Sequence, residues 1–402
     1  MAYLNNKNKK KCTGCRACEH ICPFNAIDFK SDEEGFLFPI INEEKCKQCG
    51  NCTRECAYIN GIYGELLEEQ EVYAAKIKNE EILYDSSSGG IFTVFANETL
   101  NNGGSVCGCI LDKNFVAKHI FVDRKEDLYK LRGSKYIQSD VNNTFVKTKE
   151  KLEEGNSVLY VGTPCQIAGL KQFLKKDYDN LLLIDLICHG VASPSYFKQY
   201  IEYLENKLGC KIIEYKFRDK SKFGWVGFGS YTYSNKNKKI KKYTLPEKDC
   251  FFNNYNSGII LRQSCYECKY AKTKREGDIT LADFWGIEKY HPKIKTDKGV
   301  SVIILNTIKG KKIFENVKPN IDYMTSKIEY IVKENGNIAK PSNKPVERDK
   351  LFEDLRKNGF EYISKKYLKK SGIKVKIKRI IPKNVKNIIK KIIRRKKWTL
   401  QF

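Results

Sequence analysis

The chain has 402 residues, of which 41% are hydrophobic and 30% are charged, and its formal net charge is +26. This balance excludes a wholly disordered chain, and the absence of any apolar run near the roughly 18 residues of a membrane span excludes an integral membrane protein. The length predicts two or three domains. The N-terminal segment, MAYLNNKNKKKC, lacks the apolar stretch of a secretory signal, so we expect the protein to stay in the cytoplasm.

The first unit, residues 1–64, is dominated by cysteine. It holds two copies of the spacing C-x2-C-x2-C-x3-C, the first followed by Pro23 and the second by Ala57. This run is the bacterial ferredoxin signature for two 4Fe–4S clusters. A pair of zinc knuckles is the alternative, although zinc sites rarely have the third cysteine and the three-residue spacing in duplicate.

The distance that each cysteine loop can span predicts which cysteines bind which cluster. Three cysteines in a tight loop can surround three iron corners of one cube, whereas the fourth lies too far along the chain and binds the other cube. We therefore expect one cluster on Cys12, Cys15, Cys18 and Cys56, and the other on Cys46, Cys49, Cys52 and Cys22.

The acidic stretch at residues 65–71 is interpreted as a linker or surface turn. In the second unit, residues 72–340, strands are predicted at 72–78, 105–111, 157–162 and 181–188, and helices at 89–100, 164–174 and 195–208. Residues 211–243 are strand-rich, and 300–307 and 311–317 supply a late strand and helix. Alternating strands and helices predict a mixed or parallel sheet covered by helices. The fold class is therefore α+β: a small ferredoxin-like dicluster domain, a larger mixed α/β domain and a basic helical tail.

The tail, residues 361–402, contains 16 Lys and Arg residues against the single acidic Glu361. Its apolar residues recur at helical spacing, at Val385, Ile388, Ile389, Ile392 and Ile393. A basic amphipathic helix close to Trp398 and Phe402 suits an anionic membrane surface, which would place the protein peripherally at the inner face of the membrane. Docking to an acidic partner protein is the alternative. No nucleic-acid partner is expected, because interleaved aromatic residues are sparse.

Two helix starts in the second unit favour bound anions. Ser86–Gly90 precedes a predicted helix, whose N-terminus favours phosphate, although glycine–serine turns are common at such positions. Thr163 and Pro164 are typical of a helix start and place Cys165 in the first turn, where the helix dipole favours a thiolate. A buried, unreactive Cys165 is the alternative.

Four cysteines of the second unit form a candidate third cluster site. Cys265 and Cys268 form a C-x2-C motif that supplies only two ligands. Cys165 and Cys188 lie at or just beyond the ends of apolar strands, and these ends can meet at one edge of the sheet. The sequence thus predicts a third 4Fe–4S cluster as a candidate.

The combination of motifs in residues 72–340 resembles the family of the coenzyme F420 hydrogenase/dehydrogenase beta subunit. The motifs are SSSGG at 86–90, RGSKY at 132–136, GTPCQ at 162–166, DLICHGV at 185–191, and the C-x2-C motif followed by DITLADFWG at 278–286. The resemblance implies that this unit binds FAD and iron–sulfur clusters and passes electrons between them. Some members use the deazaflavin coenzyme F420 as substrate. Bacterial relatives with a fused ferredoxin domain are often associated with surface-polysaccharide synthesis.

The resemblance also implies which residues lie near the flavin or its phosphates. They are Ser87, Ser88, Gly89, Gly90, Gly133, Ser134, Lys135, Thr163 and Pro164. Lys135 would stabilise the reduced flavin, and the alternative is a surface lysine. His189 would pass a proton to the reduced flavin, and the alternative is a histidine that orders the end of a strand. Cys107 and Cys109 share one face of a predicted strand, in the core or near the flavin.

The implied function is an iron–sulfur flavoprotein oxidoreductase. Single electrons would enter through the ferredoxin-type clusters, cross the candidate third cluster and collect on FAD, which exchanges two electrons with a small-molecule acceptor. The alternative is a non-catalytic subunit that connects a partner enzyme to ferredoxin or another redox protein. A substrate pocket beside the flavin would favour the first function, and a flat surface that exposes a cluster would favour the second.

Overall fold

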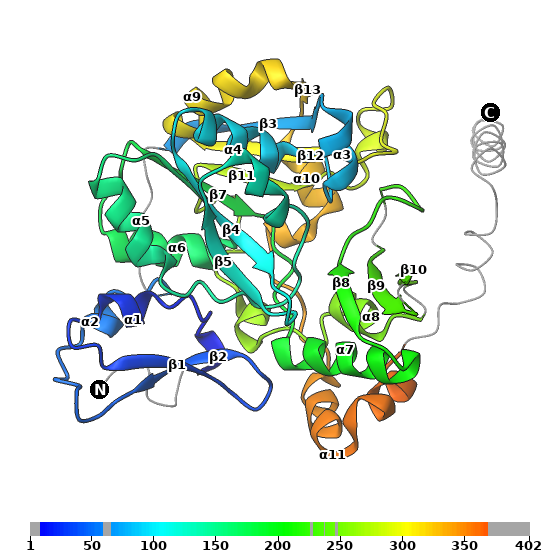
Figure 1. Ribbon diagram of the computed structural model, residues 1–402. Helices are drawn as coiled ribbons and strands as arrows, with labels where there is room; N and C mark the ends of the chain where they lie inside the picture. The colour runs from blue at the N-terminus through cyan, green and yellow to red at the C-terminus, as the bar shows by residue number, and fades with distance from the viewer. Residues whose placement is uncertain (1–8, 59–65, 226–227, 237, 246–247, 369–402) are drawn as a thin grey trace, which may run out of the picture.

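The computed structural model describes residues 9–58, 66–225, 228–236, 238–245 and 248–368 (Figure 1). A small ferredoxin-like region is followed by a larger mixed α/β region, as the sequence predicts. The predicted amphipathic tail helix, with Trp398 and Phe402, lies outside the described residues. Within those residues, no helix has both the length and the apolar character needed to cross a membrane.

The N-terminal region consists of one hairpin and three short helical turns. Its elements are η1 (Lys9–Lys11), α1 (Ala17–Ile21), β1 (Ile27–Ser31), β2 (Leu37–Ile41) and α2 (Asn51–Arg54). The strands β1 and β2 are antiparallel, with Ile27 opposite Ile41. Both α1 and α2 begin directly after a residue in the left-handed conformation, Arg16 and Gly50 respectively. The chain therefore turns sharply within each cysteine loop.

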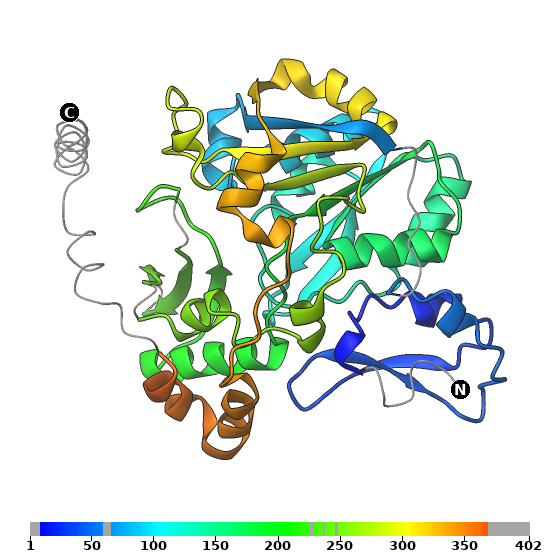
Figure 2. The same cartoon turned by 180° about the vertical axis from the view of Figure 1, so that it is seen from behind.

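An eight-stranded mixed sheet forms the centre of the larger region (Figures 1 and 2). Its strand order is β13 (Ile321–Thr325), β3 (Leu66–Ile77), β12 (Ser301–Thr307), β11 (Ile279–Asp283), β7 (Leu181–Leu186), β6 (Val158–Gly162), β4 (Ser105–Leu111) and β5 (Ala117–Val122). The four neighbouring strands β11, β7, β6 and β4 run parallel, and the strands that flank them are antiparallel. Helices cover both faces of this sheet, which is why its central strands β12, β7 and β6 are almost uniformly apolar.

Each face of the sheet has its own helical layer. On one face lie α3 (Glu80–Asp85), α4 (Ile91–Asn101), η2 (Lys125–Lys130) and α9 (Ile308–Val317). On the other face lie α5 (Thr144–Glu153), α6 (Pro164–Leu174) and α10 (Ile328–Glu334). Ala17 of the ferredoxin-like region joins the core beneath α5 and α6, so this region packs directly on the larger one.

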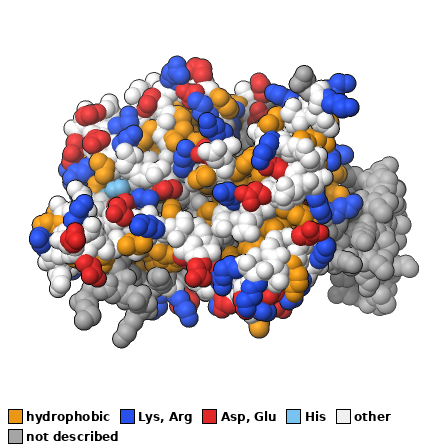
Figure 3. Space-filling model, turned by 60° about the horizontal axis from the view of Figure 1, so that its bottom comes forward, with side chains coloured by type: hydrophobic (Ala, Val, Ile, Leu, Met, Phe, Trp, Pro, Cys, Tyr) orange, Lys and Arg blue, Asp and Glu red, His pale blue; other side chains and the backbone are white. Residues whose placement is uncertain are grey.

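A second lobe packs around a small antiparallel sheet of order β10 (Lys238–Tyr243), β9 (Ser230–Asn235) and β8 (Ile212–Lys216). Its helices are α7 (Pro194–Leu208), α8 (Cys250–Asn256) and α11 (Arg348–Lys366). Shorter turns are η3 (Gln263–Glu267), η4 (Ile287–Lys289), η5 (Lys318–Asn320) and η6 (Gly336–Ile338). Figure 3 shows acidic and basic side chains interspersed over the underside of the molecule, so the net positive charge is not gathered there.

The helix predicted after Gly90 is confirmed, since α4 begins at Ile91, directly after Gly90 in the left-handed conformation. Two other local predictions differ from the structure. The acidic stretch is no linker: β3 begins at Leu66, opposite Thr307, and Glu71 lies opposite Leu305 of β12. Residues 361–366, expected to begin the tail, belong to α11, where Ile363 is buried.

Candidate functional site

The cysteines of the ferredoxin-like region act on one another electrostatically, which shows which of them lie close together. Burial raises the pKa of Cys15 to about 12, and the charges of Cys56 and Cys12 act in the same direction. Burial likewise raises the pKa of Cys52, with further contributions from Cys22, Cys46 and Cys49. Cys56 thus lies near Cys15, and Cys22 lies near Cys52, although Cys18 also has Cys52 among its neighbours. The assignment of four ligands to each cluster stays a prediction. Cys49 is exposed, so the set on Cys22, Cys46, Cys49 and Cys52 lies nearest to solvent.

A third group of cysteines lines one small cavity in the larger region. Its members are Cys165, Cys188, Cys265 and Cys268, the four residues of the candidate third cluster. We refer to it as the four-cysteine cavity. Burial raises the pKa of the Cys165 thiol, and the charges of Cys268, Cys188 and Cys265 raise it further. The four sulfurs therefore belong to one electrostatic group.

Local sequence signals and strand order bring these four residues together. Gln166 Oε1 accepts a hydrogen bond from Thr163 N at 3.0 Å, which fixes the start of α6 and places Cys165 in its first turn. Cys188 follows β7, the parallel neighbour of β6, and the carboxyl ends of parallel strands meet at one edge of the sheet. The turn η3 carries Cys265 and ends at Glu267, directly before Cys268.

The chemistry of the four-cysteine cavity fits a cluster. Burial raises the pKa of Cys188 to about 12 and that of Cys265 to about 11, so these thiols stay neutral unless a cation binds them. Among the described residues, no group of three or more His, Cys, Asp or Glu side chains has the geometry of a metal-ion site. A 4Fe–4S cluster offers each cysteine a separate iron corner.

The set on Cys12, Cys15, Cys18 and Cys56, which we call the inner ferredoxin-type set, directly adjoins the four-cysteine cavity. Cys15, Cys165 and Cys268 all pack against a small core of Ala57, Ala168 and Tyr270. The Tyr270 hydroxyl donates to the carbonyl of Ala57 at 2.8 Å. Tyr270 therefore lies between the two sets, together with Ala57 and Ala168.

A large pocket opens on the other side of the four-cysteine cavity. Its volume is about 580 Å³, within the range of ligand pockets. Thr163, Cys188 and His189 line both cavities. Of the residues that the sequence places near a flavin, the pocket is lined by Ser87, Ser88, Gly90, Gly133, Ser134, Lys135 and Thr163.

Two of the residues predicted near the flavin, Gly89 and Pro164, do not line the large pocket. A side-chain carbon on Gly89 would lie 2.4 Å from the Ala75 carbonyl oxygen, so Gly89 packs on β3 instead of lining the pocket. Pro164 lines the four-cysteine cavity. Gly89 lies just before α4 and Pro164 begins α6, and other residues of both helices line the pocket. The sequence motifs alone therefore could not distinguish Gly89 and Pro164 from the residues that line it.

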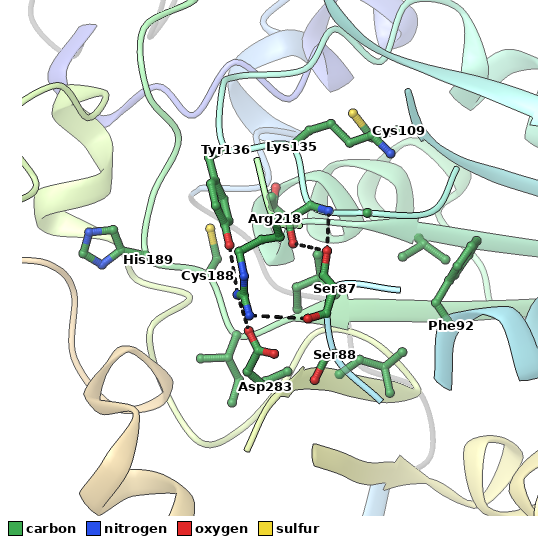
Figure 4. A pocket seen from close by; sticks show the side chains of 18 of the residues that line it. Ser87, Ser88, Phe92, Cys109, Lys135, Tyr136, Cys188, His189, Arg218 and Asp283 are labelled. Atoms are coloured by element: carbon green, nitrogen blue, oxygen red, sulfur yellow. Dashed lines mark hydrogen bonds and ion pairs between the residues drawn. The ribbon is translucent and has the colours of Figure 1, made fainter. Parts of the chain in front are cut away.

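The centre of the pocket contains polar residues that sequence reasoning missed. Figure 4 shows Arg218 directed toward Asp283, Tyr136 and Ser87. Arg218 Nη1 lies 2.9 Å from Asp283 Oδ2, and Nη2 donates to the Ser87 carbonyl at 3.4 Å. The DITLADFWG motif contains Asp283 and Trp285, and the Arg218 guanidinium lies 5.1 Å from the Trp285 ring.

Two further basic residues give the pocket an anion-binding character. Lys135 Nζ donates to the carbonyls of Leu131 and Arg132, and burial lowers its pKa to about 8. Arg132 lines the pocket, and its Nε is buried without a hydrogen-bond partner in the described structure. Cys109 also lines the pocket, whereas Cys107 is buried in the core, so the strand β4 provides both predicted environments.

Both ring nitrogens of His189 have protein partners. Nε2 lies 3.1 Å from the Tyr255 carbonyl oxygen, and Nδ1 lies 3.2 Å from Asn337 Oδ1. The ring also packs edge-on against Tyr255. These contacts favour the alternative in which His189 orders the end of its strand over that of a proton carrier.

Comparisons with known proteins agree with the geometry. Residues 72–161 match the N-terminal part, and residues 155–330 the C-terminal part, of the coenzyme F420 hydrogenase/dehydrogenase beta subunit. Residues 11–59 match a 4Fe-4S dicluster domain. The chain is thus an iron–sulfur protein of the electron-transferring, oxidoreductase class. It belongs to the family of the coenzyme F420 hydrogenase/dehydrogenase beta subunit.

Several known proteins are similar to this chain. A component of the F(420)H(2) dehydrogenase of Methanosarcina mazei is 24% identical over 78% of this chain and 84% of its own length. The coenzyme F420-dependent sulfite reductase of Methanocaldococcus jannaschii is 29% identical over 75% of this chain and 45% of its own length. A chain of the F420-reducing NiFe hydrogenase complex from Methanosarcina barkeri is 18% identical, with a TM-score of 0.42 over 75% of this chain and 91% of that chain.

Proposed function

We propose that the protein is an iron–sulfur flavoprotein oxidoreductase with three 4Fe–4S clusters and one FAD. The observation that carries the proposal is the shared wall of the two cavities: Thr163, Cys188 and His189 line both the four-cysteine cavity and the large pocket. FAD, when bound, supplies the conversion between single electrons and electron pairs.

The cysteine sets form a series that leads from the surface to this pocket. The exposed Cys49 marks the outer end, where a redox partner can approach. The inner set follows, and Tyr270 lies between it and the four-cysteine cavity, together with Ala57 and Ala168. Electrons can pass in either direction along this series, because nothing in it fixes the direction.

The basic residues of the pocket bind and orient an anionic ligand. Arg132 offers its buried, unpartnered Nε, and Lys135 offers a positive charge below about pH 8. Arg218 is held in place by Asp283, and Tyr136 stacks on Tyr255 with ring centroids 4.6 Å apart. Planar aromatic walls beside positive charge suit a flavin ring joined to phosphates.

The two-electron acceptor that we propose is a deazaflavin of the F420 type. This assignment rests on the family and on the names of the relatives, two of which act on or depend on F420. The alternative function is a subunit without a substrate site. It is less well supported, because a pocket of about 580 Å³ adjoins the four-cysteine cavity.

A variant that fills the pocket tests the proposal. Ser134 lines the pocket, and its backbone N–H donates to Ser87 Oγ at 2.9 Å. In Ser134→Trp the indole would occupy ligand space, so the protein should keep its iron and lose FAD. Iron content and FAD binding are measured on the anaerobically reconstituted protein.

The control is Lys113→Trp, which adds the same ring at an exposed turn between β4 and β5. This control should bind FAD as the unmodified protein does. If Ser134→Trp binds FAD with unchanged affinity, the pocket is not the flavin site and the proposed function is wrong.

A further inference from the structure

Arg262 is a buried arginine at the junction of the ferredoxin-like region and the four-cysteine cavity. Only 1% of its surface is exposed, and its side chain lines that cavity. Its Nε donates to the carbonyl of Cys12 at 2.8 Å, and its Nη1 donates to Gln138 Oε1 at 3.2 Å. The guanidinium lies over the ring of Phe38, 4.0 Å from its centroid.

The positive charge of Arg262 has no carboxylate partner in the described part of the chain. Three other buried arginines do pair with carboxylates: Arg218 with Asp283, Arg275 with Asp185, and Arg348 with Glu34. In addition, the Nη2 atom of Arg262 is buried without a hydrogen-bond partner. Since an unpaired buried charge is strongly unfavourable, the site requires an anion.

Both neighbouring cysteine sets can supply that anion. On one side, a side-chain carbon on Gly14, between Cys12 and Cys15, would lie 3.3 Å from Arg262 Cζ. On the other side, Cys265 lines the same cavity as Arg262, and its backbone N–H donates to the Arg262 carbonyl at 2.9 Å. Four thiolates around a cluster make it an anion, and each added electron makes it more negative.

We propose that Arg262 is a positioning and tuning residue that serves two clusters at once. Its uncompensated charge lies between the cluster on Cys12, Cys15, Cys18 and Cys56 and the cluster in the four-cysteine cavity, and it favours the reduced form of both. An electron that moves between them oxidises one cluster and reduces the other, with no bond made or broken and no proton moved. This inference rests on the proposed function for the second of the two clusters.

Potentiometric titration of the anaerobic protein, followed by low-temperature EPR, tests this role. In Arg262→Gln the amide keeps hydrogen-bonding capacity but loses the charge. The equilibrium constant for reduction of the Cys12 cluster should fall at least about tenfold, equivalent to about 59 mV for one electron. The cluster in the four-cysteine cavity should shift in the same direction.

Two control variants separate charge from structure. Arg262→Lys keeps the charge, so its reduction constants should stay within about threefold of the unmodified protein. Lys11→Gln removes an exposed charge directly before Cys12, where water screens it, and should also stay within about threefold.

Several outcomes would overturn the inference. Unchanged potentials in Arg262→Gln with intact iron would do so, and so would a shift in Arg262→Lys as large as that in Arg262→Gln. If the glutamine variant fails to hold iron, the lysine variant decides, and a fall of about tenfold or more in its reduction constants would overturn the inference. Iron analysis of the unmodified protein tests the third cluster separately. Without that cluster, the proposed function fails while the shift at the Cys12 cluster still tests Arg262.

Discussion

At the scale of single residues, Lys135 offers the clearest link between local environment and ligand binding. Burial lowers its pKa to about 8, and two backbone carbonyls hold its Nζ beside the pocket. Lys135→Met removes this charge and should weaken FAD binding about tenfold near neutral pH, or about 1.4 kcal/mol. Titration of the protein with FAD, followed by flavin fluorescence, measures the change.

The pH dependence of binding has a definite sign. A bound anion favours the charged lysine and raises its pKa in the complex. The affinity of the unmodified protein should therefore fall as the pH rises above about 8, where the free protein loses the charge. The Lys135→Met variant should lack this fall. Parallel pH profiles for the two proteins would show that Lys135 does not contact the ligand.

Asp185 is the second-last residue of β7, three residues before Cys188, and its contacts stabilise the fold there. It is fully buried, pairs with Arg275 at 3.3 Å and accepts a hydrogen bond from Thr280 Oγ1 at 2.5 Å. Asp185→Asn leaves the arginine unpaired, so it should lower the free energy of unfolding by about 3–5 kcal/mol.

Urea denaturation of the iron-loaded protein measures that loss. The matched control is Asp322→Asn, which breaks an exposed ion pair with Lys76 and should cost less than about 1 kcal/mol. Equal losses in the two variants would contradict a structural role for the buried pair.

Some residues could be identified from the sequence and others could not. The spacing of the cysteines predicted the two ferredoxin-type sets, strand ends added Cys165 and Cys188 to Cys265 and Cys268, and a motif led to Lys135. Arg218 and Arg262 have no motif, because their roles depend on partners 65 and 250 residues away, Asp283 and Cys12. Only the folded chain brings those partners together.

At the scale of elements, helix α6 connects the two regions of the protein. Its first turn carries Cys165, and Gly169 faces the inner ferredoxin-type set. A side-chain carbon on Gly169 would lie 2.9 Å from Cys15 Cβ and 3.0 Å from its sulfur. The close approach explains why this helix tolerates a glycine that costs roughly 1 kcal/mol in helix propensity.

Gly169→Ala should therefore disturb the Cys15 loop although alanine favours helices. We expect slower electron transfer from the ferredoxin-type clusters to the pocket and a loss of roughly 1–3 kcal/mol in stability from overpacking. Stopped-flow reduction and urea denaturation measure the two effects. Gly336→Ala, whose new carbon would meet only the end of Lys340 at 3.5 Å, is the control. A stabilised Gly169→Ala protein with unchanged kinetics would contradict the close contact.

The elements differ in how far their own sequence determines them. The predicted bounds of α6 agree with the observed ones, because Thr163 and Pro164 encode its start locally. The first half of β3 was missed, because four of its residues, 68–71, are Glu or Gln and become part of a strand only by pairing with β12. Strand pairing over such a sequence separation leaves no local signal.

At the scale of the whole molecule, the fold arranges the cysteine sets in a series that ends at the pocket. The ferredoxin-like region packs on α5 and α6, and the carboxyl ends of the parallel strands provide Cys188 and the start of α6. The sequence predicted this division into regions. It did not predict the shared wall of the two cavities, which requires the strand order of the mixed sheet.

The most direct test is the cofactor content of the protein purified without oxygen. Iron, acid-labile sulfide and released flavin are measured per chain. We predict about twelve irons and one FAD, since three 4Fe–4S clusters and a flavin follow from the three cysteine sets and the pocket. About eight irons would show that the four-cysteine cavity holds no cluster, and the absence of flavin after attempted reconstitution would contradict the flavoenzyme itself.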